Sequence, residues 1–105
     1  FRTFIEKGVL MCGSTDSPVQ SLDPWQQMLG MTQFYNEDES ISPYEAFKCY
    51  TVNPTKAILE ENERGQLLPG MRADFFTGDK NIFSLSPEPV RKGWCEMTVQ
   101  KVSQK

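Results

Sequence analysis

The sequence predicts an α+β fold in which the end of an α/β barrel is followed by short antiparallel strands. Three observations support this prediction. A helix end and Gly8 precede a continuous apolar run at residues 9–13, helices with clear start signals follow, and the pattern changes to short strands after Gly65. A continuous apolar run is typical of a strand buried on both faces, as in parallel sheets. We therefore expect residues 1–64 to form the barrel end and residues 65–105 the antiparallel strands.

The bulk composition argues against several classes of partner. The 105 residues suit one domain, with a net charge of -3 and a sequence pI of about 4.9. The basic residues are mostly scattered, so nucleic acid is not expected as a partner. No apolar run approaches the roughly 18 residues that span a membrane, so no membrane partner is expected. The chain begins with Phe1, so we expect a processed chain or a piece of a longer protein.

Cysteine and histidine usage limits the chemistry. The three cysteines are widely spaced and form no C-x-x-C motif, which favours buried, reduced thiols in a cytoplasmic protein. Histidine is absent. This excludes Ser-His-Asp and Cys-His catalysis within the chain and removes the commonest ligand of transition metals. We therefore expect no cofactor in the isolated chain.

The predicted first strand leads into a loop that carries the candidate functional residue. Residues 2–7 should end a helix that stops at Gly8, and residues 9–13 should form the strand. The loop at residues 13–18 then begins where the strand ends, and barrels carry their catalytic side chains at that end. Asp16 is the candidate in this loop. The alternative is that its carboxylate only accepts hydrogen bonds from local backbone donors.

A helix with an apolar stripe is predicted next. Asp23 can cap it and Pro24 fits its first position, so it should run to about Tyr35. Its methionine and aromatic side chains are expected in the core, with the lining of a substrate site as the alternative. The acidic residues 36–40 lack the ligand spacing of a calcium loop and are expected to be a solvated connection.

A capping box marks the following helix. Residues 42–45 read Ser-Pro-Tyr-Glu, with proline at the first helical position. This helix should end near Thr51, and Asn53-Pro54 should start a short further helix after a break at Asn53. Ile41 is expected to pack on Ala46 as a hydrophobic staple.

Strands are predicted in the last part of the chain. Residues 66–70 should form a short strand that enters a type II turn at Pro69-Gly70. A second strand is expected over residues 71–77, followed by a turn at 78–81. Residues 84–89 contain two prolines and are expected to be irregular. A last strand is expected over 95–102, where alternation predicts one buried and one wet face.

Three segments resemble the amidohydrolase superfamily, and most closely the branch often called amidohydrolase 3. Residues 8–24 resemble its G-S/T-D-x-P-V…D-P segment. Residues 42–57 resemble its T-x-x-E-A-L…Y-T-x-N-x-A-x-A segment, and residues 65–75 its G-S-L-x-P-G-K-x-A-D-F/L segment. The three occur in the family's order and spacing. The resemblance covers about residues 3–80.

This resemblance implies a fold and a function. The family fold is a TIM-type (β/α)8 barrel with a β-sandwich built from both chain ends. This sequence would supply the eighth barrel strand, the helices after it and the C-terminal sandwich strands. The implied activity is metal-dependent hydrolysis of non-peptide C–N, amide-like bonds in a small molecule, with zinc or another divalent metal as cofactor. Asp16 matches the family aspartate that touches the metal or its bound water and moves a proton, so it is the candidate catalytic residue and possible metal ligand in the full-length context.

The departures from the family pattern predict an inactive chain. The family holds its metal with an H-x-H pair, often a modified lysine, and two further histidines, and this sequence has no histidine. Gln100-Lys101 also replaces the usual Gly-Lys near the C-terminus. One carboxylate cannot hold a catalytic zinc ion, and one strand is not a barrel. We therefore expect a C-terminal fragment of a hydrolase that is inactive alone.

A strand and helices without the rest of the barrel leave apolar faces that need partners. The fragment must pack these faces on its own β part, on the rest of the barrel or on a second copy of the chain. Trp25, Phe34 and Phe47 are the candidate contacts. Two alternatives to a hydrolase fragment stay open at this point. One is a non-catalytic interaction or exoenzyme-regulatory module derived from the same fold, and the other is an unrelated small globular domain.

Overall fold

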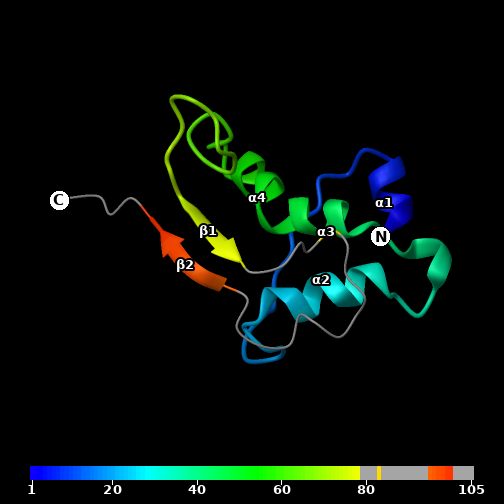
Figure 1. Cartoon of the computed structure of the whole chain (residues 1–105). Helices are drawn as coiled ribbons and strands as arrows, with labels where there is room; N and C mark the ends of the chain where they lie inside the picture. The colour runs from blue at the N-terminus through cyan, green and yellow to red at the C-terminus, as the bar shows by residue number, and fades with distance from the viewer. Residues whose placement is uncertain (79–82, 84–94, 101–105) are drawn as a thin grey trace.

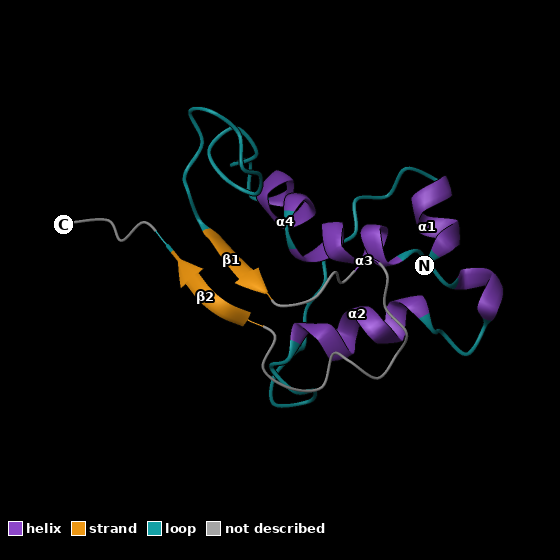
Figure 2. Ribbon diagram, viewed as in Figure 1, coloured by secondary structure: helices purple, strands orange, loops and turns teal. Residues whose placement is uncertain are grey.

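Helices form the first part of the chain, and a two-stranded antiparallel sheet lies beside them (Figure 1 and Figure 2). The computed structural model describes residues 1–78, 83 and 95–100. The elements are α1 (Arg2–Glu6), α2 (Pro24–Thr32), the 3-10 helix η1 (Glu37–Glu39), α3 (Pro43–Tyr50), α4 (Val52–Ala57), β1 (Phe75–Gly78) and β2 (Cys95–Val99). This order confirms the α+β class.

The stop signal at Gly8 acts as predicted. The N–H of Gly8 donates to the carbonyl of Ile5, and the N–H of Val9 donates to the carbonyl of Phe4, both at 2.9 Å. Gly8 has a φ of 73°, the left-handed conformation that glycine adopts at little cost. Together these features form a Schellman motif, which satisfies the last carbonyls of α1.

The helix α2 begins as predicted but ends earlier. Asp23 accepts a hydrogen bond from the N–H of Trp25 at 3.0 Å, which confirms its capping role. The helix ends at Thr32 rather than near Tyr35. The N–H of Phe34 donates to the hydroxyl of Ser40 at 3.0 Å instead of to a helical carbonyl. The chain therefore turns back toward α3 at this point.

The capping box at the start of α3 is complete. The hydroxyl of Ser42 accepts from the N–H of Glu45 at 3.2 Å, and the Glu45 carboxylate accepts from the N–H of Ser42 at 2.9 Å. The break after α3 falls at Thr51, with φ -124° and ψ -78°, two residues before the predicted position. Pro54 is then the third residue of α4, where a backbone N–H has no helical partner anyway.

The core is small and lies among the helices. Met28, Ile41 and Ala46 form its buried cluster, and Cys49 is also buried. Ile41 and Ala46 belong to the same cluster, as a hydrophobic staple requires. The predicted stripe is confirmed in part, because Met28 is buried in this core and Trp25 and Met31 pack against it, whereas Tyr35 is 91% exposed. The partly buried side chains packed against the cluster are Phe1, Ile5, Met11, Trp25, Met31, Phe47 and Tyr50.

The predicted strand at residues 9–13 does not form within this chain. This segment has no ladder partner, and Val9 and Leu10 are 49% and 48% exposed. A parallel strand needs neighbours on its edges, and the described residues provide none. Cys12 lies in this unpaired segment and is exposed, so the expectation of a buried thiol is wrong for Cys12. The expectation is confirmed for Cys49, which is buried.

The β part is shorter than predicted. Residues 66–68 and 71–74 are not strands, and the first strand begins at Phe75. The Pro-Gly turn is present, because the N–H of Met71 donates to the carbonyl of Leu68 at 3.1 Å and Gly70 has a φ of 89°. Residues 66–74 therefore make no ladder hydrogen bonds to a neighbouring strand among the described residues.

The two strands pair antiparallel with a bulge. Phe75 pairs with Val99, and the register shifts between Thr77 and Gly78. The observed β2 lies within the predicted 95–102 segment. Gln100 is described and is not part of the strand. Residues 101–102, most of the turn predicted at 78–81 and the irregular segment at 84–89 lie outside the described residues.

Aromatic contacts join the helices to the sheet. The rings of Trp25 and Phe47 stack with centroids 6.5 Å apart, and Trp25 meets Phe76 of β1 edge-on at 6.0 Å. Phe34 packs on Phe1 with centroids 4.8 Å apart. The three candidate contact residues therefore pack within the chain. Among the described residues, no helix is long and apolar enough to cross a membrane.

The capping box predicts a measurable share of the stability. Ser42→Ala removes the acceptor for the N–H of Glu45 and should lower the free energy of unfolding by about 1 kcal/mol. Ser42→Thr keeps the acceptor and serves as the control. Urea denaturation followed by circular dichroism measures both variants, and an unchanged midpoint for Ser42→Ala would contradict the role of the cap.

A second prediction concerns pH. The Arg2 guanidinium binds both oxygens of Glu45, at 2.9 and 3.0 Å. Arg2 first, and then the donors of Ser42, lower the pKa of Glu45 from 4.5 to about 2. A lowered pKa stabilises the fold above the unfolded value, so this contribution is lost as pH falls from 4.5 to about 2. The wild type should therefore lose more stability over this range than Glu45→Gln in urea titrations. Equal losses in both proteins would show that Glu45 is not responsible.

Candidate functional site

The Asp16 loop presents its aspartate to solvent. Asp16 is exposed and has a φ of 48°, a left-handed conformation that aspartate tolerates better than most residues. Its carbonyl accepts from the N–H of Val19 at 2.9 Å, and its N–H donates to the hydroxyl of Ser14 at 3.4 Å. These bonds use the backbone of Asp16. No described residue donates a hydrogen bond to its carboxylate, so the local bonds of Asp16 come from its backbone alone.

The segment before the loop lies against the junction between α3 and α4. Gly13 donates its N–H to the carbonyl of Cys49, and the side-chain amide of Asn53 donates to the carbonyl of Met11, both at 2.8 Å. The ring of Tyr50 covers Gly13 so closely that an added Cβ would lie 2.1 Å from Cε2. Neither Tyr50 nor Asn53 was predicted as a site residue. Their place in the Y-T-x-N segment of the family pattern was the signal that could have found them.

The residues present do not fit a metal site by themselves. Within the described ranges there is no group of three or more His, Cys, Asp or Glu side chains that could hold a metal ion. Asp16 supplies one carboxylate, and a catalytic zinc site needs three protein ligands. The chemistry available at this loop is therefore that of a single exposed carboxylate, which can accept a proton or complete a set of ligands supplied from elsewhere.

A pocket of about 390 Å³ opens beside the segment that leads to the loop. It is lined by Phe1, Cys12, Gly13, Ser14, Gln27, Gly30, Met31, Phe34 and Tyr50. Asp16 is not among these residues. Met31 and Phe34 come from the predicted α2 stripe and its end, so the alternative that this stripe lines a site stays open for them. The core role holds for Met28, which is buried.

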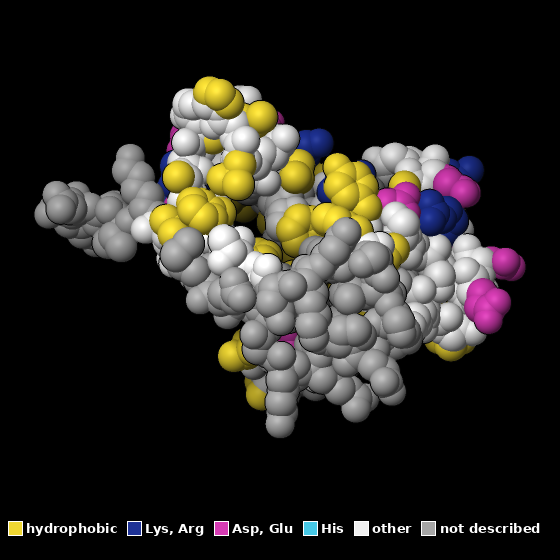
Figure 3. Space-filling model, in the orientation of Figure 1, with side chains coloured by type: hydrophobic (Ala, Val, Ile, Leu, Met, Phe, Trp, Pro, Cys, Tyr) yellow, Lys and Arg dark blue, Asp and Glu magenta, His cyan; other side chains and the backbone are white. Residues whose placement is uncertain are grey.

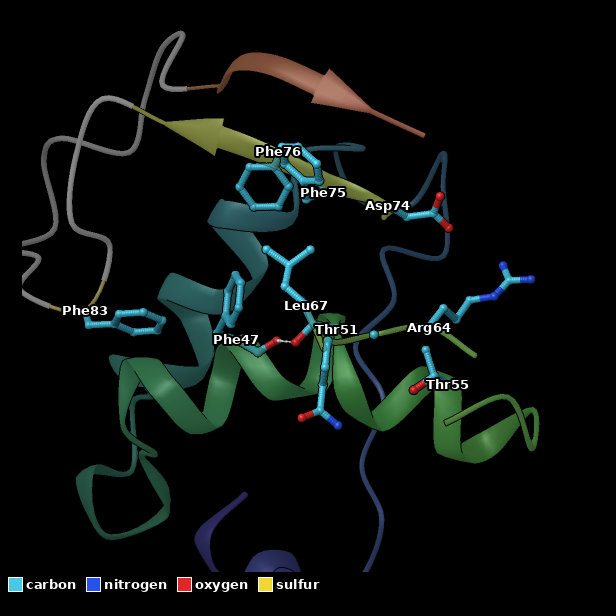
Figure 4. Close-up of a pocket in the computed structure, with 11 residues that line it drawn as sticks. Phe47, Thr51, Thr55, Arg64, Leu67, Asp74, Phe75, Phe76 and Phe83 are labelled. Atoms are coloured by element: carbon cyan, nitrogen blue, oxygen red, sulfur yellow. Dashed lines mark hydrogen bonds between the residues drawn. The ribbon is translucent and has the colours of Figure 1, made fainter. Parts of the chain in front are cut away.

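A larger pocket of about 600 Å³ lies between the α3–α4 helices and β1. On the face shown in Figure 3, hydrophobic side chains gather around a hollow beside the helices. Figure 4 shows the rings of Phe47, Phe75 and Phe76 around this space. The remaining lining residues are Thr51, Thr55, Arg64, Gly65, Gln66, Leu67, Asp74 and Phe83.

Most polar groups of this larger pocket are already paired within the chain. The hydroxyl of Thr51 donates to the carbonyl of Phe47 at 3.0 Å, and that of Thr55 donates to a carbonyl of α4. Arg64 pairs with Glu60 at 2.6 Å, and Asp74 pairs with Arg72 at 3.2 Å. The described lining of this pocket is therefore mainly apolar.

Comparison with known proteins places the chain in a family. Residues 1–101 match the amidohydrolase family, so the chain belongs to this family. This finding confirms the resemblance to the amidohydrolase 3 branch and excludes an unrelated small domain.

One relative shows how much of such a protein the chain represents. The putative amidohydrolase YtcJ of Bacillus subtilis (strain 168) is 32% identical over 100 residues. The match covers 83% of this chain and 18% of the relative. The chain thus spans less than a fifth of the curated relative that it matches. No solved structure matches it significantly.

The free carboxylate of Asp16 leads to a prediction about stability. Asp16→Asn keeps the size of the side chain, and asparagine also tolerates the left-handed conformation. The free energy of unfolding of the chain should therefore change by less than about 0.5 kcal/mol. Urea denaturation of the two proteins checks this. A clear loss of stability would show that Asp16 has a structural role after all.

Proposed function

We propose that this chain is the C-terminal part of a metal-dependent hydrolase of non-peptide C–N, amide-like bonds, and that it is inactive alone. Family membership together with a span of 18% of the relative carries the proposal. A (β/α)8 barrel needs about 250 residues, more than twice the length of this chain. In this proposal residues 1–64 complete the barrel, and residues 65–105 supply sandwich strands.

Asp16 has the catalytic role in this proposal. An exposed carboxylate with no local use is suited to accept a proton from an attacking water molecule. Its place after the 9–13 segment supports this role, because barrels carry catalytic residues in the loops that follow their strands. In this proposal Asp16 is also a possible metal ligand, and the other ligands come from the rest of the full-length protein, since the described residues hold no cluster that could bind a metal.

The rest of the barrel is the proposed partner of the 9–13 segment. Val9 and Leu10 are about half exposed, and Val19 and Leu22 after them are 72% and 76% exposed. Neighbouring barrel strands would cover the first pair and supply the missing ladder hydrogen bonds. A second copy of the chain is the alternative partner for the same surface. The free thiol of the exposed Cys12 favours a reducing, cytoplasmic setting.

A second candidate function is a non-catalytic interaction module, including an exoenzyme-regulatory one. The larger pocket favours it, because its apolar walls and internally paired polar groups suit the burial of an apolar partner surface. The native mass separates the two functions. A product several times heavier than 12.0 kDa supports the hydrolase, and one near 12.0 kDa supports the module.

The catalytic role of Asp16 is tested in the protein of native length. The zinc-loaded protein should hydrolyse a member of a panel of p-nitroanilides, followed by the release of nitroaniline. Asp16→Asn should lower kcat by about 100-fold or more, because it removes the proton acceptor. The 105-residue chain should show no hydrolysis with added zinc.

Asp23→Asn is the matched control for this experiment. It makes the same chemical change seven positions further along, and asparagine caps a helix as well as aspartate does. Its kcat should equal that of the wild type. Full activity of Asp16→Asn would refute the proposed role, and hydrolysis by the isolated chain would refute its inactivity.

A further inference from the structure

We propose that Tyr50 and Asn53 are positioning residues, which hold the 11–13 segment and thereby set the place of the Asp16 carboxylate. The junction between α3 and α4, residues 49–53, is the element that carries them. This inference rests on the proposed function, because it assigns a purpose to the position of Asp16. Neither residue touches Asp16, and both act through the backbone before it.

The first step is the set of contacts on one backbone edge. Met11 offers its carbonyl to Asn53, and Gly13 offers its N–H to the carbonyl of Cys49, each at 2.8 Å. Residues two apart in an extended chain direct these groups to the same side. The junction therefore binds the segment at two successive points of one edge, where the described residues supply no strand.

The second step is the contact between Tyr50 and Gly13, which leaves no room for a side chain at position 13. The ring of Tyr50 lies where a Cβ at position 13 would stand, at 2.1 Å from Cε2 and 2.2 Å from Cζ. No side chain fits there unless the ring or the segment moves. The φ of Gly13 is not in the left-handed region, so the close approach of Tyr50 is the reason for glycine at this position.

The third step is the break between the two helices. Thr51 leaves the helical conformation with φ -124° and ψ -78°. This break brings Tyr50, the last residue of α3, and Asn53, in the first turn of α4, against the same segment. The ring therefore covers Gly13 from the end of one helix, and the amide reaches Met11 from the start of the next.

The last step is the short distance to the candidate carboxylate. Asp16 follows Gly13 by three residues, so at most about 10 Å of extended chain separates the anchor from the aspartate. A misplacement of about 1 Å at a reacting group can cost about 100-fold in rate. Loss of the anchor should therefore lower kcat, while the apparent affinity for substrate changes little.

The test combines hydrogen exchange of the 105-residue chain with kinetics of the native-length, zinc-loaded protein on the p-nitroanilide that it hydrolyses. Asn53→Ala should speed exchange of the Gly13 amide by about 10-fold or more, because its anchor opens locally. The amide of Gln33, which donates to Leu29 in α2, should keep its protection and so report an intact fold. In the native-length protein, kcat should fall by about 10-fold or more with KM within about 2-fold.

Two further variants separate positioning from general stability. Asn53→Asp keeps the shape of the side chain and loses the amide donor, so it should behave as Asn53→Ala does. Gly13→Ala should lower kcat through its clash with Tyr50, and Gly13→Ala combined with Tyr50→Ala should recover part of that loss. Asn36→Ala is the matched control, because no described residue bonds to the Asn36 side chain, and it should leave both readouts unchanged.

Each outcome decides the proposal. Lost Gly13 protection with unchanged kcat would overturn it, as would lost kcat with full Gly13 protection. A double variant no better than Gly13→Ala alone would also overturn the part assigned to Tyr50. If Asp16→Asn is fully active in the same assay, the proposed function fails, and the exchange of Gly13 alone then decides whether the junction holds the loop.

Discussion

The Glu45 carboxylate is the contact on which the helical layer depends, because two elements use it at once. It caps α3 through the N–H of Ser42 and binds the Arg2 guanidinium of α1 through both oxygens. One side chain thus caps α3 and joins α1 to it. The core and the 11–13 segment both depend on the position of α3. Its residues Ala46 and Cys49 are buried, and the junction at its end holds residues 11–13.

The core of the described residues is small, and much apolar side-chain surface is exposed. Only four hydrophobic side chains of the described residues are buried, and large apolar side chains such as Val19, Leu22 and Leu67 are 69–76% exposed. In the proposed full-length protein, other parts of the amidohydrolase cover these exposed side chains. The match to less than a fifth of a longer relative agrees with that proposal.

Sequence reasoning worked best where the signal is local. The stop at Gly8, the caps at Asp23 and Ser42 and the Pro69-Gly70 turn all formed, because each depends on bonds between residues a few positions apart. It failed for the strands at 9–13 and 66–68, because a strand forms only with a partner edge. The candidate site was predicted in part. Asp16 came from the family pattern, whereas the anchors Tyr50 and Asn53 were missed.

The sequence by itself determined the class of the fold, the helix boundaries that caps and glycine mark, the family and the candidate aspartate. It did so because these features are written in short motifs whose physics is local. Only the tertiary structure decided that Tyr50 covers Gly13, that Asn53 binds Met11 and that Trp25 joins the helices to β1. These contacts connect residues about 37 to 51 positions apart. Such pairs depend on how the helices pack, and no local pattern encodes that.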